Sequence, residues 1–251
     1  MPTQRQEAAG KSIIIIGAGL AGLSAGCYGR MNGYRTRIFE LHTIPGGLCT
    51  GWKRKGYTFD GCIHWLMGSG SGIFHRFYQE LGAVQGVPMH DPEEFGRVEG
   101  EGGKTLILHA DIDRLQAHLK ELSPADGDVI DELCKGVRDL ARMEAPVEKP
   151  MELMGFFDKL RMVRSLPSLK ATNKWSRVSI KDFASRFRDP FLRSAFQGLA
   201  EVFFESGSSM VGLMMGIAQT YKRNGGLPRG GALEFAKAIE RRYLDLGGEV
   251  Q

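Results

Sequence analysis

The stretch that decides the fold is KSIIIIGAGLAGLSAGCYGRMNGYRTRIFE, which runs from Lys11 to Glu40. Within it, Ile13–Ile16 is a short β-branched run, and such a run predicts a strand buried on both faces of a parallel sheet. A glycine-rich turn follows, then a pattern that predicts a helix over Leu23–Met31, and then a second strand over Arg35–Phe39. The order strand, glycine loop, helix, strand predicts the βαβ start of a Rossmann-like domain.

The turn has the GxGxxG spacing of a dinucleotide-binding loop, and each glycine has its own role. Gly17 permits a sharp turn, Gly19 leaves room for a pyrophosphate, and Gly22 lets the helix pack closely on the strand. The phosphates would lie at the positive N-terminus of the helix. Glu40 is placed to bind the hydroxyl pair of a ribose, and its charge disfavours the 2′-phosphate of NADP. The predicted loop contacts are Gly17, Ala18, Gly19, Leu20, Ala21 and Gly22.

The length, charge and cysteine spacing of the chain argue against several classes of function. The chain has 251 residues, enough for one large domain or two small ones, and a net charge of +4 that is not concentrated in one run. We therefore expect no nucleic-acid partner. The four cysteines lack CxxC spacing and no histidine cluster joins them, so we expect no metal site and free thiols in a reducing compartment.

The first ten residues lack the apolar core of a signal peptide, and the longest apolar runs are too short to span a membrane. A cytoplasmic protein is expected. Peripheral contact with the inner face of a membrane stays open as an alternative.

A second glycine pair follows in LHTIPGGLCTGWKRKGYTFDGCIHWLMGSG, residues 41–70. Gly46-Gly47 is not needed to hold NAD, but it is useful for a longer cofactor that continues past the pyrophosphate. After it, Lys53–Gly56 predicts a turn and Tyr57–Asp60 predicts a short strand.

These motifs resemble the flavoprotein superfamily of amine oxidases, phytoene desaturases and Rab GDP-dissociation inhibitors. The segment GYTFDGCIHWL, residues 56–66, is most similar to the carotenoid desaturase and retinol saturase branch. The resemblance implies FAD, with its ADP half on the first glycine motif and its flavin near the glycine pair and the residues after Phe59-Asp60. Leu48 stands where the family usually has an arginine, so a pyrophosphate contact from that arginine is not expected here. The further contacts implied by the resemblance are Glu40, Gly46, Gly47, Leu48, Ile63, His64 and Trp65.

The middle of the chain predicts mostly helices. Residues 151–177 combine apolar and basic side chains, and two interpretations stay open: an amphipathic helix on a membrane surface, or a core-packed helix or lid with a solvated basic face. Met210–Ala218 is apolar and rich in methionine, which suits either a lipid tunnel or a plain helical core. The remaining predicted elements are a strand over 104–109 and helices over 74–81, 111–122, from 123 to about 144, from 179, from 189 and over 232–246.

The predicted organisation is α/β. A Rossmann-like FAD/NAD(P)-binding domain with a parallel sheet is formed by residues 10–72 and 222–251, after a tail of residues 1–9. A largely helical α+β substrate domain over 73–221 is inserted into it. Members of the family are much longer chains, so the resemblance implies an N-terminal half whose partner is the missing C-terminal half.

The function implied by the resemblance is an FAD-dependent oxidoreductase. It would act on CH–CH bonds of a long hydrophobic, carotenoid- or isoprenoid-like substrate by hydride transfer to or from flavin. Three alternatives remain: a flavin amine oxidase, a non-catalytic lipid- or prenyl-binding protein, and an inactive half-length fragment. The catalytic residues are unknown. His64 is the one candidate, and its other interpretation is a packed ring that lines the pocket.

Overall fold

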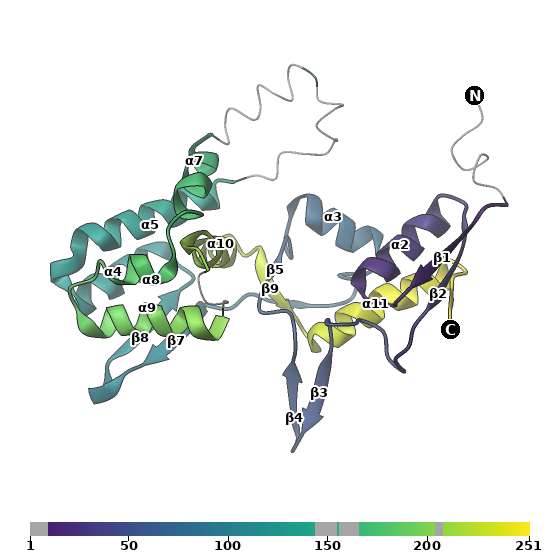
Figure 1. Ribbon diagram of the computed structural model, residues 1–251, viewed down its shortest axis with the longest axis horizontal. Helices are drawn as coiled ribbons and strands as arrows, with labels where there is room; N and C mark the ends of the chain where they lie inside the picture. The colour runs from purple at the N-terminus through teal and green to yellow at the C-terminus, as the bar shows by residue number, and fades with distance from the viewer. Residues whose placement is uncertain (1–9, 144–154, 156–165, 204–207) are drawn as a thin grey trace. The chain divides into compact units, whose positions relative to one another are not determined.

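The computed structural model describes residues 10–143, 155, 166–203 and 208–251, which form two compact units (Figure 1). The first unit contains Met1–His90 and Gly226–Gln251, and the second contains Asp91–Gly225. The first segment thus extends past residue 72, because the helix after it packs on the same core. Leu81 and Ala83 are buried there, and the Tyr28 hydroxyl donates a hydrogen bond of 2.7 Å to Glu80.

A three-stranded parallel sheet organises the first unit. Its order is β1 (Ser12–Ile16), β2 (Arg35–Phe39) and β10 (Glu249–Val250), so the two ends of the chain meet in one sheet. Helix α2 (Leu20–Met31) connects β1 to β2, and α11 (Gly231–Asp245) leads into β10. The predicted βαβ start and the parallel sheet are confirmed.

Burial of the sheet differs from the prediction. Thr36 and Ile38 lie on a buried face, where Gly26 of α2 comes so close to Tyr243 of α11 that a Cβ would be only 2.7 Å from its ring. The opposite face leaves Ile14 and Ile16 69% and 83% exposed. The prediction that Ile13–Ile16 is buried on both faces is therefore wrong, because both helices pack on the same side of these strands.

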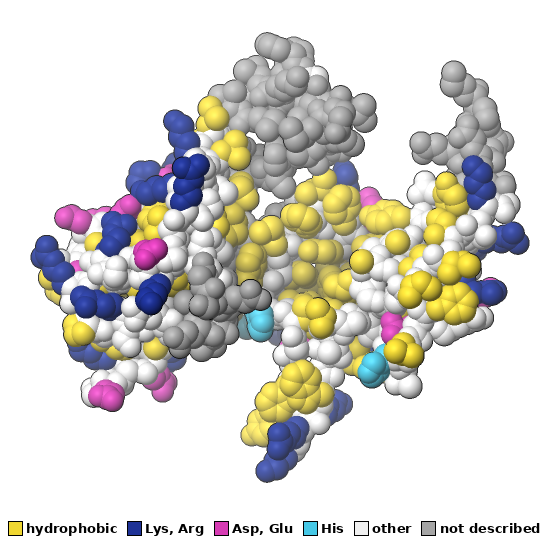
Figure 2. All heavy atoms as spheres, viewed as in Figure 1, with side chains coloured by type: hydrophobic (Ala, Val, Ile, Leu, Met, Phe, Trp, Pro, Cys, Tyr) yellow, Lys and Arg dark blue, Asp and Glu magenta, His cyan; other side chains and the backbone are white. Residues whose placement is uncertain are grey.

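An antiparallel hairpin follows β2 in the chain. β3 (Gly51–Arg54) pairs with β4 (Tyr57–Asp60) across a tight turn, in which Lys55 and Gly56 have φ angles of 48° and 83°. The rings of Trp52 and Phe59 stack across the two strands with centroids 6.1 Å apart. Figure 2 shows hydrophobic side chains along this hairpin and basic ones at its tip. The other elements of the unit are α3 (Gly72–Glu80) and a small sheet of order β5 (Leu66–Met67), β9 (Gly225–Pro228) and β6 (Met89–His90).

The second unit is mostly helical. Its core contains rings that meet edge to face or stack, with Phe183 and Phe187 at 5.6 Å and Phe187 and Phe196 at 5.0 Å. The elements are β7 (Glu94–Glu99), η1 (Glu101–Gly103), β8 (Thr105–His109), α4 (Ile112–Leu122), η2 (Pro124–Asp126), α5 (Gly127–Ala141), α7 (Leu166–Trp175), α8 (Ile180–Ala184), α9 (Pro190–Phe203) and α10 (Met210–Tyr221).

Local sequence signals account for several of these boundaries. Asp111 caps α4 by accepting a 2.8 Å hydrogen bond from the Arg114 amide, and Ser179 caps α8 by accepting one of 2.9 Å from the Asp182 amide. On α10, Met210 and Met214 are fully buried, and Gly136 of α5 lies too close to Met214 for a Cβ to fit. These contacts favour the helical-core interpretation of Met210–Ala218 over a tunnel.

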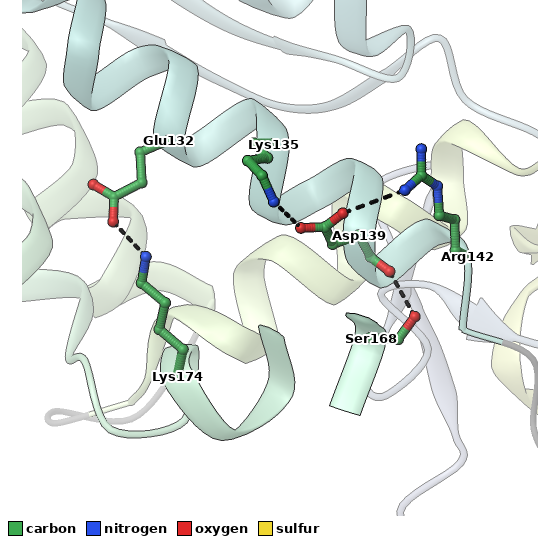
Figure 3. Close-up of polar contacts among 6 residues, drawn as sticks. All are labelled: Glu132, Lys135, Asp139, Arg142, Ser168 and Lys174. Carbon is green, nitrogen blue, oxygen red and sulfur yellow. Dashed lines mark hydrogen bonds and ion pairs between the residues drawn. The ribbon is translucent and has the colours of Figure 1, made fainter. Parts of the chain in front are cut away.

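Helix α7 lies in the described part of the predicted amphipathic segment, residues 151–177. Trp175 is buried, the Ser168 hydroxyl donates a 2.7 Å hydrogen bond to the Asp139 carbonyl oxygen of α5, and Lys174 pairs with Glu132 at 2.6 Å (Figure 3). This part therefore packs on α5 and pairs a basic residue with it. Residues 151–154 and 156–165 lie outside the described residues. Of the helices in the described part of the chain, none is long and apolar enough to cross a membrane.

Candidate functional site

The first glycine loop connects β1 to α2 and has the geometry that its sequence predicts. Gly17 has a φ of 94°, which favours glycine, and its amide donates a 2.7 Å hydrogen bond to the Phe39 carbonyl oxygen of β2. A Cβ on Gly22 would overlap the Gly17 carbonyl oxygen, whereas one on Gly19 would meet no atom within 4 Å. Gly22 is thus required for packing, and Gly19 borders open space.

The N-terminus of α2 borders this open space. Gly19 is the N-cap, no side chain caps the helix, and its first turn carries no acidic residue. The first intrahelical bond runs from the Leu23 amide to the Gly19 carbonyl oxygen at 2.9 Å. The amides of Leu20, Ala21 and Gly22 therefore have no acceptor inside the helix, and together with the helix dipole they suit an anion.

Glu40 lies beside the loop, directly after β2. Its carboxylate accepts hydrogen bonds from the backbone amides of His42 at 2.8 Å and Ala18 at 2.6 Å. These bonds, the one from His42 foremost, hold the pKa of Glu40 below its usual value, so the group is ionised at neutral pH. The Glu40 amide also donates a 2.7 Å hydrogen bond to Gln251, which ties this position to the end of β10. The structure therefore brings the predicted acid to the edge of the glycine loop.

The second glycine loop runs next to the first. The Gly46 amide donates a 2.8 Å hydrogen bond to the Ala18 carbonyl oxygen, and Gly19 and Gly46 form a parallel bridge. Gly46 and Gly47 have φ angles of 109° and 59°, and a Cβ on Gly47 would be 3.4 Å from the Gly19 Cα. Two loops that the sequence separates by more than twenty residues thus form one glycine-lined surface.

The other predicted contacts are less closely joined to this surface. Leu48 follows the second loop with its side chain 88% exposed. Ile63 packs against the core of the first unit, His64 is exposed and Trp65 is half-buried. A cofactor role for these four residues, and a catalytic role for His64, stay predictions. The described residues contain no group of three or more His, Cys, Asp or Glu side chains arranged to hold a metal ion.

Asp60 has a structural role that the sequence reasoning missed. Its carboxylate accepts a 2.7 Å hydrogen bond from the Ala232 amide in the first turn of α11, and Gly231 lies so close that a Cβ would be 2.8 Å from it. A negative charge at a helix N-terminus is stabilising. The only sequence signals were an acid at the end of a predicted strand and a glycine pair before a predicted helix. Those two signals are 170 residues apart in the chain.

Comparisons with known proteins agree with this geometry. Residues 15–81 match the family described as NAD(P)-binding Rossmann-like domain. The chain is 26% identical over 256 residues to a phytoene desaturase (lycopene-forming) of Pseudescherichia vulneris, covering 96% of this chain and 48% of that protein. It is also 26% identical over 254 residues to a chloroplastic prolycopene isomerase of Daucus carota, covering 95% of this chain and 40% of that protein.

Among solved structures, an oxidoreductase from Methanosarcina mazei superposes with a TM-score of 0.54 at 20% identity, over 96% of this chain and 50% of that chain. This likeness establishes the fold. Homologues of the chain are thus phytoene desaturases, prolycopene isomerases and retinol reductases. The chain spans about half the length of the curated relatives it matches.

Proposed function

We propose that the chain carries the ADP-binding part of an FAD-dependent oxidoreductase. The enzyme would act on CH–CH bonds of a long hydrophobic, isoprenoid-like substrate, in either direction of hydride transfer. The observation that carries the proposal is the pairing of two glycine loops beside an ionised Glu40 at the N-terminus of α2. The curated relatives, which include desaturases and a retinol reductase, support the substrate class and leave the direction open.

The residues of the site fit a flavin dinucleotide. The amides of Leu20, Ala21 and Gly22 would bind the pyrophosphate, and the open space over Gly19 would admit it. Glu40 would accept hydrogen bonds from the adenosine ribose while the Ala18 amide keeps its carboxylate oriented. A second glycine loop is not needed to hold NAD. The Gly46-Gly47 loop lengthens the binding surface for a cofactor that continues past the pyrophosphate, and this favours FAD. When bound, FAD supplies the two-electron acceptor or donor for the substrate.

The cofactor assignment is tested by the visible absorption spectrum of the purified chain, before and after incubation with excess FAD and desalting. We expect a retained flavin band. Glu40→Ala should weaken binding by about tenfold or more, because it removes a charged hydrogen-bond acceptor. Glu249→Ala is the matched control, since Glu249 is also a strand-end carboxylate but pairs with Arg37 at 2.8 Å on the surface. Equal flavin retention by the parent and Glu40→Ala would contradict the assignment.

The substrate class is tested on flavin-loaded enzyme under anaerobic conditions. Polyenes of the phytoene type should reduce oxidised flavin if the enzyme is a desaturase, and polyenes of the retinol type should reoxidise flavin reduced beforehand with dithionite if it is a saturase. Bleaching by polyamines alone would instead identify an amine oxidase. A chain that binds these polyenes but never retains flavin would identify a lipid-binding protein of the same fold.

We also propose that a second polypeptide segment, equivalent to the other half of the relatives, completes the site. The face of the sheet that carries Ile14 and Ile16 is largely exposed, and Phe39 on the same face is 38% exposed. Such a face suits burial against protein. Co-expression with the second half of the fold should raise flavin retention per chain. The double variant Ile14→Glu, Ile16→Glu should abolish that gain in flavin retention, and alone it should melt at the same temperature as the parent. An unchanged gain would contradict the proposal.

A further inference from the structure

Two cysteines, Cys49 and Cys62, flank the base of the β3–β4 hairpin. The register of the hairpin pairs Gly51 with Asp60, and the Gly61 amide donates a 2.9 Å hydrogen bond to the Thr50 carbonyl oxygen. The strand pairing therefore continues one position beyond the named strands. Cys49 and Cys62 lie on either side of this hydrogen-bonded pair, with Cys49 in a turn that its amide closes onto the Gly46 carbonyl oxygen.

The side chains of this pair are also in contact. The Cys62 thiol interacts with the Cys49 thiol, which also donates a 3.2 Å hydrogen bond to the Ala232 carbonyl oxygen. A disulfide needs Cα atoms about 4.4–6.8 Å apart and Cβ atoms about 3.5–4.5 Å apart. The hydrogen bond between Gly61 and Thr50 and the interaction of the two thiols bring the cysteines near each other, as a disulfide requires.

The two thiols differ in access to solvent. Cys49 is 3% exposed, and Cys62 is exposed. Burial, with smaller contributions from the neighbouring Cys62 and Asp60, raises the pKa of Cys49 to about 12. Cys49 is therefore a weak nucleophile by itself, and an external reagent meets Cys62 first.

We propose that Cys49 and Cys62 are a reversible redox pair, which forms an intramolecular disulfide by exchange with a small-molecule disulfide. The Cys62 thiolate attacks one sulfur of the small disulfide, forms a mixed disulfide and releases one small thiol. Cys49 then gives its proton to solvent and attacks the Cys62 sulfur, which expels the second small thiol. The protein dithiol loses two electrons and two protons, and the small disulfide is reduced to two thiols.

The positions of Cys49 and Cys62 connect disulfide formation to the proposed cofactor site. Cys49 follows the second glycine loop, to which its amide is bound by a 2.9 Å hydrogen bond to the Gly46 carbonyl oxygen. Cys62 precedes Ile63–Trp65. The disulfide fastens these two segments to each other and removes the thiol hydrogen bond to Ala232. If the proposed function is correct, oxidation also alters flavin retention, but disulfide formation itself does not depend on that function.

Peptide mapping tests the proposal directly, because trypsin cleaves after Lys53, Arg54 and Lys55, between the two cysteines. The native chain is equilibrated in buffers of reduced and oxidised glutathione, its thiols are blocked at low pH, and the digest is examined by mass spectrometry without reduction. We expect peptides 38–53 and 56–76 to appear joined, with a loss of two of the four free thiols. Excess dithiothreitol should restore both thiols.

Three variants separate the outcomes. Cys62→Ser should lose no thiol, because the remaining Cys49 is buried. Cys49→Ser should stop at a stable mixed disulfide on Cys62. Cys134→Ser is the matched control, since Cys134 is a buried thiol of α5, and it should still give the joined peptides. Glutathione that stays on Cys62 of the parent, or four free thiols at every glutathione ratio, would overturn the proposal.

Discussion

Replacement of Gly22 by alanine separates packing from cofactor binding in the first glycine loop. The new Cβ would overlap the Gly17 carbonyl oxygen and lie 3.2 Å from both the Gly17 carbonyl carbon and Ile15 Cγ2. Backbone atoms cannot move aside cheaply, and overpacking of this kind costs about 1–3 kcal/mol. Alanine regains about 0.5–1 kcal/mol inside a helix. We therefore expect a net loss of about 1–2 kcal/mol of stability.

Gly19→Ala should behave in the opposite way. Gly19 has a φ of −66°, which alanine adopts without strain, and its Cβ would meet no atom within 4 Å. The stability cost is limited to a poorer N-cap, about 0.5–1 kcal/mol. The methyl group would instead occupy the space over the loop where the pyrophosphate is proposed to lie. Flavin retention should fall in a chain that remains folded.

Both variants are compared with the parent by thermal melts followed by circular dichroism and by flavin retention after desalting. Each kcal/mol corresponds to about 2–4 °C for a chain of this size, so Gly22→Ala should melt roughly 2–8 °C lower. Gly127→Ala is the control, because Gly127 begins α5 with open space around its Cβ position, and it should melt no lower than the parent. The reasoning fails if Gly22→Ala has the same melting temperature as the parent, or if Gly19→Ala retains as much flavin as the parent.

Two other carboxylates give predictions that urea denaturation can check. Asp126 is 2% exposed and accepts hydrogen bonds from the Ser123 hydroxyl at 2.8 Å and from the Arg188 and Asp189 amides at 2.8 and 3.1 Å, so Asp126→Ala should cost about 2 kcal/mol or more. Burial alone would raise the pKa of Asp126, but these bonds hold it below its usual value. The carboxylate's stabilisation is therefore complete above about pH 4, where the unfolded group titrates, and is lost as the pH falls through the lower folded pKa. The parent should lose more stability than Asp126→Ala below that pH, and parallel curves would contradict the assignment. Asp60→Ala should cost about 1 kcal/mol through loss of the contact that caps α11, and an unchanged denaturation midpoint would show that the cap contributes nothing.

Local signals in the sequence were sufficient for much of the fold. Gly17, Gly19 and Gly22 are separated by fixed steps within one turn, so their roles follow from spacing alone. Glu40 could be placed because parallel strands joined by one helix end at the same edge of a sheet. The caps by Asp111 and Ser179 are also local, since each bonds to an amide three residues ahead.

Features that depend on distant parts of the chain could not be predicted in this way. Asp60 caps a helix that begins 171 residues later, and no periodicity connects the two positions. The hairpin that brings Cys49 near Cys62 is closed by the turn at Lys55-Gly56. The sequence predicts that turn. However, two of the four residues of β3 are Lys53 and Arg54, so the strand lacks the alternation of apolar and polar residues from which its pairing could have been followed towards Cys49.

The glycine loops and the exposed face of the sheet differ in whether they need further protein to be complete. Ile13–Ile16 is apolar at every position, as in a strand that is covered on both sides, yet α2 and α11 cover only one side. The glycine loops, in contrast, are already joined through Gly46 and Ala18 by contacts made within the first unit. The proposed ADP-binding surface should therefore form without further protein, whereas the exposed isoleucines predict that this face of the sheet is buried only when further protein is supplied. Amide hydrogen exchange can separate the two. The Gly46 amide should be protected in the isolated chain, and β1 should gain protection when the other half of the fold is supplied. An unprotected Gly46 would show that the loops join only in the completed protein.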